Sequence, residues 1–322
     1  MLKNNKVLAI GLGITVALGG CNMEKDSTKM THIETSAKAN QKDGVTLKTE
    51  NLVSVQEYNG EGYALRNGEK TDKIAEDHRE DIEVAVKKLF IEKYKTEVLV
   101  HNLVGNMNGV SVFVESVGEP HFHTVAIVPI DIDNKTIETD NKTIETDKVF
   151  TQSGQVEDAL ASGLYAMAYE EEIESLNNFI VQMSKDYSLV GKNEEAVKNV
   201  GGTGFRTPFY FISSIGETFD KINSLYLEDQ NVDKKEIRSI LDESKFNPDD
   251  VNIVFNVFMK DGNIVPDEKA YGEISNMIET AEGFPRGSYS LLMHDNLINS
   301  KYGSGSKGNT IDKHALKEIM KE

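Results

Sequence analysis

Residues 98–116, VLVHNLVGNMNGVSVFVES, contain the pattern that decides the fold. Apolar side chains alternate along both halves of this stretch, and a period of two is typical of β-strands. Between the halves lies Asn108-Gly109, a dipeptide that favours a two-residue hairpin turn. A second turn, Gly118-Glu119-Pro120, leads into an apolar run over residues 124–130. The stretch therefore predicts an antiparallel β-meander.

The segment before the meander has helical periodicity. Behind Thr71-Asp72, the expected cap, apolar residues recur with the spacing of one helix face: Ile74, Ile82, Ala85, Val86, Leu89, Phe90 and Tyr94. We expect one amphipathic helix of about five turns that lies across a face of the meander. The folded part is expected to begin near Leu52-Val53-Ser54-Val55.

Helical and strand patterns also alternate in the second half of the chain. A long helix is predicted over residues 156–183, with Glu170-Glu171-Glu172 on its solvated face. The final order of strand 251–259, helix 267–281 and strand 288–294 indicates a crossover unit with parallel pairing. The predicted fold class is therefore α+β, with a helix packed on an antiparallel β-meander in the first half and mixed helices and strands in the second half.

The first 21 residues have the pattern of a bacterial lipoprotein signal. Lys3 and Lys6 precede an apolar run over residues 7–18, and Leu18-Gly19-Gly20-Cys21 resembles the lipoprotein cleavage box. The run is too short for a transmembrane helix, which needs about 20 apolar residues. Cys21 is the one cysteine of the sequence, so we expect it to carry the lipid and the mature chain to lack a disulfide. A non-lipidated signal cleaved nearby is the alternative.

These features divide the sequence into four expected parts. Residues 1–20 are a lipoprotein signal peptide, 21–50 a flexible tether, 51–300 the α+β lipoprotein domain and 301–322 a flexible C-terminal tail. The glycine-rich stretch 201–204 is a candidate hinge inside the domain. This organisation predicts a protein on the extracytoplasmic face of the cell membrane, anchored through the lipid on Cys21.

The acidic composition restricts the partners. The sequence has 53 acidic and 35 basic side chains, a net charge of −18, which becomes −20 when Lys3 and Lys6 leave with the signal peptide. A negative field of this size opposes contact with nucleic acid and with anionic headgroups. We therefore expect no nucleic-acid partner and a membrane contact made by acyl chains alone. The remaining candidates are an envelope or extracellular protein, a peptide or a wall polymer.

Residues 133–139, DNKTIET, are repeated in tandem as residues 140–146. An insertion of an odd number of residues within a paired strand would turn every later side chain to the opposite face of the sheet. The duplication is therefore expected in a loop or hairpin tip. We favour a tolerated surface insertion over a displayed epitope or a ligand-binding element.

Four stretches resemble an uncharacterised lipoprotein family, domain of unknown function 1672. They are VQEYNGEGY at 55–63, YKTEV at 94–98, GVSVFVESVGEPHF at 109–122 and FRTPFYFI at 205–212. The resemblance covers about residues 52–300 and implies a Gram-positive cell-envelope lipoprotein. It brings no activity with it, and the duplicated heptad departs from the family pattern, which implies a variable loop.

One group of side chains suggests a metal. Glu119, His121 and His123 occupy alternate positions and would share one face of an extended strand, and zinc or another transition metal accepts these ligands. However, no fourth ligand is evident, and His101 would reach the group in only one register of the meander. Polar residues that close a hairpin explain the pattern without a metal, so we assign no metal and no other cofactor.

No sequence motif establishes catalysis. GSGSKG at 303–308 matches G-x-G-x-x-G, but only 14 residues follow Gly308, whereas a dinucleotide site needs an acid about 20 residues farther on. We assign no catalytic residue and expect a non-enzymatic binding or interaction module. The alternatives are an envelope hydrolase or metal-binding protein that uses dispersed histidines and acids such as Glu115 and Glu119, and a structural accessory of the envelope.

Overall fold

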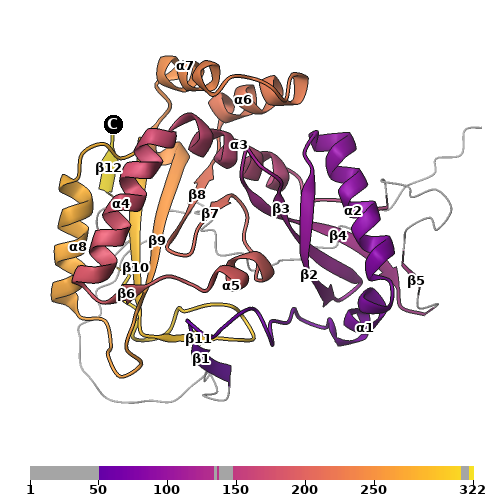
Figure 1. Cartoon of the computed structure of the whole chain (residues 1–322). Helices are drawn as coiled ribbons and strands as arrows, with labels where there is room; N and C mark the ends of the chain where they lie inside the picture. The colour runs from indigo at the N-terminus through magenta and orange to yellow at the C-terminus, as the bar shows by residue number, and fades with distance from the viewer. Residues whose placement is uncertain (1–50, 134–135, 138–147, 313–318) are drawn as a thin grey trace, which may run out of the picture. The chain divides into compact units, whose positions relative to one another are not determined.

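Two larger β-sheets, a small two-stranded sheet and the helices packed on them form the described part of the molecule (Figure 1). The computed structural model describes residues 51–133, 136–137, 148–312 and 319–322. The signal peptide, Cys21, the tether and nearly all of the duplicated heptad lie outside these residues. No helix in the described ranges has the length and hydrophobicity needed to cross a membrane.

The first sheet is the predicted meander. Its strands pair antiparallel in the order β2-β3-β4-β5, and the β2–β3 hairpin turns at Met107-Asn108. The alternation therefore predicted the hairpin correctly, but the turn lies one residue before the expected Asn108-Gly109, because Gly109 pairs with Asn106 as the first residue of β3. The strands are β2 (Val98–Asn106), β3 (Gly109–Ser116), β4 (His123–Asp131) and β5 (Thr136–Ile137).

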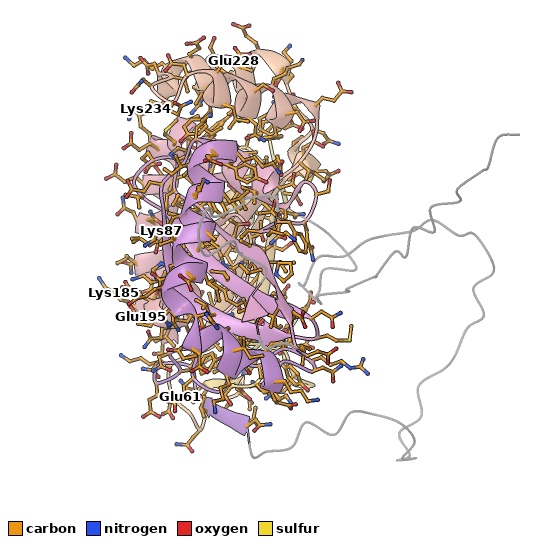
Figure 2. The ribbon with its side chains drawn as sticks, turned by 90° about the vertical axis from the view of Figure 1, so that its right-hand side faces the viewer. Glu61, Lys87, Lys185, Glu195, Glu228 and Lys234 are labelled. Carbon is orange, nitrogen blue, oxygen red and sulfur yellow. The ribbon has the colours of Figure 1, made fainter. Side chains whose placement is uncertain are left out.

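The single helix predicted before the meander is wrong, because the chain forms α1 (Glu69–Asp77) and α2 (Arg79–Tyr94) with a break at His78. Residues 76–81 are all charged or polar, so no apolar contact holds a continuous helix across this point. Each helix instead buries its own apolar residues, such as Ala75 in α1 and Ile82 in α2. Lys87 lies on the solvated side of α2 (Figure 2).

A backbone contact fixes α1 against the end of β2. The Asp72 carboxylate accepts the N–H of Gly105 at 2.5 Å, and the Thr71 hydroxyl donates to the Gly68 and Asn106 carbonyls. A Cβ atom on Gly105 would lie 2.4 Å from the Gly68 carbonyl oxygen. Only glycine therefore permits this approach.

Gly105→Ala is expected to lower the free energy of unfolding by about 2–3 kcal/mol, the usual cost of overpacking. Urea denaturation measures this change. Gly272→Ala is the control, because Gly272 lies in the helix α8 (Glu268–Thr280) and a Cβ there would meet nothing within 4 Å. The free energy of unfolding of Gly272→Ala should rise by about 0.5–1 kcal/mol. Equal effects of the two substitutions would contradict the role of the α1–β2 contact.

The second sheet has the order β12-β10-β9-β8-β7, and β6 pairs with the end of β9. β9 and β10 are parallel and α8 connects them, which confirms the predicted crossover unit. A separate two-stranded sheet joins β1 to β11 antiparallel. The strands are β1 (Leu52–Ser54), β6 (Leu189–Val190), β7 (Phe205–Arg206), β8 (Tyr210–Ser214), β9 (Val251–Met259), β10 (Gly287–His294), β11 (Leu297–Asn299) and β12 (Ile319–Lys321).

The long helix predicted over residues 156–183 is also two helices, which meet at Tyr169. Glu170, Glu171 and Glu172 therefore lie in the first turn of α4, where negative charge stabilises the helix N-terminus. The helices not yet given are α3 (Gln155–Ala168), α4 (Glu170–Asp186), α5 (Glu194–Asn199), α6 (Glu217–Glu228) and α7 (Lys234–Ser244), and η2 (Pro248–Asp250) is a short 3-10 helix.

One hydrophobic core extends across both sheets. It includes Val128 of β4, Leu164 of α3 and Ile253 of β9, and α3 contacts strands of both sheets. At the candidate hinge, Gly204 exchanges two backbone hydrogen bonds with His123, at 2.9 and 3.0 Å. The structure therefore gives no division of the domain at residues 201–204.

The segment assigned to a flexible tail packs on the domain in its described parts. β12 pairs with β10, and Ile311 exchanges backbone hydrogen bonds with Met293. The largely covered side chain of Lys307 forms an ion pair with Asp295 at 2.6 Å. The sequence prediction failed here because short polar, glycine-rich stretches look like linkers even where they cover a sheet. Lys307 thus serves this packing.

Candidate metal centre

The centre of the site is Glu115 on β3. Its position in the ladder is opposite His123 of β4 and Leu99 of β2. Directly opposed residues of antiparallel strands project from the same face of the sheet. The register of the meander therefore brings the Glu115 carboxylate and the His123 imidazole together.

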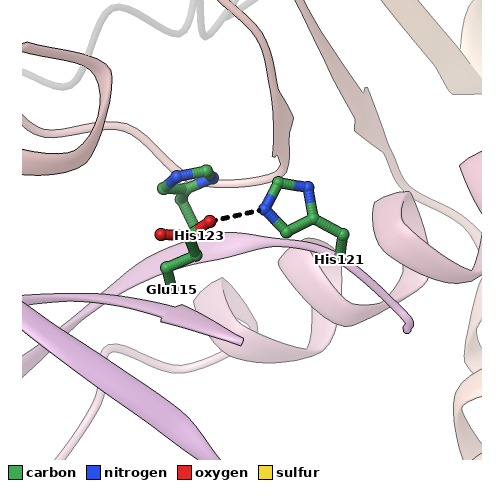
Figure 3. A group of neighbouring side chains, drawn as sticks. All are labelled: Glu115, His121 and His123. Atoms are coloured by element: carbon green, nitrogen blue, oxygen red, sulfur yellow. Dashed lines mark hydrogen bonds and ion pairs between the residues drawn. The ribbon is translucent and has the colours of Figure 1, made fainter. Parts of the chain in front are cut away.

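His101 and His121 reach the same carboxylate from two sides. The Nε2 atom of His121 lies 2.9 Å from one Glu115 oxygen (Figure 3), and that of His101 lies 2.6 Å from the other. A β-bulge in β2 leaves His101 without a ladder partner beside Glu115. Bulges of this kind often direct a side chain into a site.

The imidazole of His123 is buried and has no hydrogen-bond partner in the described structure. Its side chain is 5% exposed, and neither ring nitrogen has a partner among the described residues. Burial lowers its pKa to about 3, and the charge of His121 adds to this effect. The ring is therefore neutral, and leaving its polar atoms unpaired costs about 1–3 kcal/mol.

The electrostatics keep Glu115 ionised. Burial by itself would raise the pKa of this carboxyl group, but the hydrogen bond from His121 and the neighbouring His123 and His101 hold the pKa below its ordinary value. The site thus presents a carboxylate and a neutral imidazole, which are the forms that bind metal ions.

The sequence prediction grouped Glu119 with His121 and His123, but in the structure the carboxylate beside these histidines is that of Glu115. Ligand atoms of these three residues all lie within 4.8 Å of one another. Glu119 faces elsewhere. Its carboxylate accepts the backbone N–H of His121 at 3.3 Å and lines a separate pocket with Glu170 and Lys234. Alternation failed because β4 begins only at His123, so residues 119–121 are not part of the strand.

Two histidines and one carboxylate suit zinc, which in many proteins has three protein ligands and one open position. His101 would hold the second oxygen of Glu115 and orient the carboxylate, as outer hydrogen-bond partners commonly do. The side chains of His121 and Glu115 are 29% and 18% exposed, which leaves a path for an ion. The residues therefore fit a transition-metal ion.

Comparison with known proteins identifies relatives of this fold. A family model described as a protein of unknown function, DUF1672, matches residues 46–321. The chain is also similar to the crystal structure of a DUF1672 family protein from Staphylococcus aureus subsp. aureus Mu50, with a TM-score of 0.68 and 19% identity over 84% of this chain and 98% of that one. No curated protein matches significantly.

Proposed function

The chain belongs to the DUF1672 family, whose function is unknown, and from this premise we propose that it is a lipid-anchored envelope protein that binds a transition-metal ion of the zinc type. The metal ligands are Glu115, His121 and His123. The observation that carries the proposal is the buried His123. Its two ring nitrogens are unpaired among the described residues, and it lies beside a carboxylate and a second imidazole.

A metal ion would remove the main energetic defect of the site. A buried imidazole without a hydrogen bond destabilises the folded state, whereas coordination uses one of its nitrogens. Binding to the folded state alone also stabilises it by mass action. The arrangement is therefore better suited to holding an ion than to strengthening the metal-free sheet.

Binding is favoured over hydrolysis. Many hydrolytic metal sites place a general base beside the metal-bound water. In the described part of the chain, Glu115 is the one carboxylate of the cluster and acts as a ligand. Anchoring through Cys21 is supported by the signal pattern, and it would present the site outside the membrane to an envelope protein, peptide or wall polymer.

The direct test is zinc titration of the full, metal-free chain in detergent by isothermal calorimetry. We expect one site in the wild type and an affinity at least about 100-fold lower in His121→Ala, because a ligand is lost. His78→Ala is the matched control, since the ion pair that His78 makes in the described structure is with Asp81, away from the candidate ligands. The proposal is wrong if zinc binds to all three proteins equally or to none.

A further inference from the structure

Among the described residues of this strongly acidic protein, Arg206 is a cation without an anionic partner. Its guanidinium lies over the ring of Phe211 at 5.1 Å and, within the same residues, makes no hydrogen bond or ion pair. Arg79, Arg238 and Arg286, by contrast, each pair with a carboxylate. Arg206 is also partly buried, so its charge is not fully compensated by water.

Lys192 is a second such cation beside it. Its backbone N–H donates to Pro208 at 2.8 Å, which places it next to the β7–β8 connection, and its Nζ donates to the Gly303 carbonyl at 3.0 Å. No carboxylate in the described ranges lies within ion-pair distance of this amine. Burial lowers the pKa of Lys192 to about 7 with a further contribution from Arg206, and burial lowers that of Arg206 to about 10.

A glycine loop supplies neutral donors at the same place. The Arg206 guanidinium lies against Gly202, since a Cβ atom there would be 1.8 Å from Nη1. Gly201 and Gly202 have positive φ angles, 35° and 125°. In the described structure the N–H groups of Gly201, Gly202 and Thr203 have no acceptor, whereas the next one, of Gly204, bonds to His123. Successive free N–H groups of a loop can bind an anion together.

We propose that Arg206, Lys192 and the N–H groups of residues 201–203 bind a phosphate group. A guanidinium fork offers two parallel hydrogen bonds to one anion, and an ammonium adds a point charge. Donors from several directions suit a tetrahedral anion with oxygens on every side. None of these residues is a ligand of the candidate metal centre. Arg206 lies close enough to His123 for its charge to act on that ring, so the two sites are neighbours, and the phosphate proposal does not require a bound metal.

The test is calorimetric titration of the full, metal-free chain in chelator at constant ionic strength. The probes are inorganic phosphate and glycerophosphoglycerol, with acetate as the reference anion. We expect saturable binding of a phosphate compound and weak binding of acetate. Tighter binding of inorganic phosphate indicates a free phosphate as the natural ligand, and tighter binding of the diester indicates a polymer or headgroup phosphate.

Arg206→Gln should weaken phosphate binding at least about tenfold, as expected for the loss of a charge-assisted hydrogen bond. Arg79→Gln removes the same charge from the surface of α2 and should leave the affinity unchanged. Because Arg206→Gln removes an uncompensated cation, the melting temperature of this variant without phosphate should be no lower than that of the wild type. If Arg206→Gln does not fold, the phosphate affinity of Lys192→Gln tests the proposal in its place. Unaltered phosphate affinity in the folded variant, or no binding by the wild type, overturns the proposal.

Discussion

Replacing His123 with leucine is expected to stabilise the metal-free protein and to abolish zinc binding. The histidine is 5% exposed and both of its ring nitrogens lack partners in the described structure. Leucine removes these unpaired polar atoms and keeps an apolar side chain of similar size. The free energy of unfolding should therefore rise by about 1–2 kcal/mol in chelator.

Zinc should reverse the order of stability, so that the wild type becomes more stable than His123→Leu. A ligand at 1,000 times its dissociation constant stabilises the folded state by about 4 kcal/mol, and this gain is available to the wild type alone. Urea unfolding in chelator and in excess zinc measures both effects. A histidine that serves metal binding thus lowers the free energy of unfolding without the metal and raises it when the metal is bound.

His294→Leu is the control for buried histidines in general. His294 is 1% exposed, and burial lowers its pKa to about 3 like that of His123. However, its Nδ1 atom has a hydrogen-bond partner, the Thr310 hydroxyl at 2.9 Å. Its replacement should destabilise the protein with or without zinc. If His123→Leu destabilises the metal-free protein to the same extent, the ring is a structural element and the metal proposal fails.

The sequence predicted those parts of the fold that depend on local signals. The meander follows from strict alternation and Asn108-Gly109, and the crossover unit follows from three patterns in order. The breaks at His78 and Tyr169 were missed because a helical period continues in phase across a short break. Tertiary packing decides whether such a helix bends or divides, and it also decides whether the segment after residue 300 covers the sheet.

The candidate site was predictable only in part. The i, i+2 spacing of His121 and His123 is visible in the sequence, but the carboxylate that joins them is Glu115. Its place depends on the exact pairing of β3 with β4, and that of His101 depends on a bulge. Arg206 lies on β7, and Lys192 lies in the connection between β6 and α5, and the second sheet brings these two segments together. The pairing register of strands that are distant in sequence leaves no local signal. Only the structure could therefore show that these residues lie together.

Cys21→Ser is expected to move the protein from the membrane fraction to the soluble fraction. Two acyl chains anchor a protein stably, with about 0.8 kcal/mol for each buried CH₂ group. The rest of the mature chain has a net charge of −20 when residues 1–20 are removed, and this charge opposes adsorption to anionic headgroups. Metabolic labelling with a clickable palmitate analogue should mark the wild type and leave Cys21→Ser unlabelled.

Ser27→Ala is the matched control, because it alters a hydroxyl six residues after Cys21 and preserves the thiol. It should remain labelled and membrane-bound. An alkaline carbonate wash then separates lipid anchoring from attachment through a bound protein, since the wash removes the latter. Equal labelling of Cys21→Ser and wild type would contradict lipidation at this thiol. If an unlabelled Cys21→Ser protein stays in the membrane fraction after the carbonate wash, some other segment holds the chain in the membrane. The argument that the negative charge prevents adsorption would then fail too.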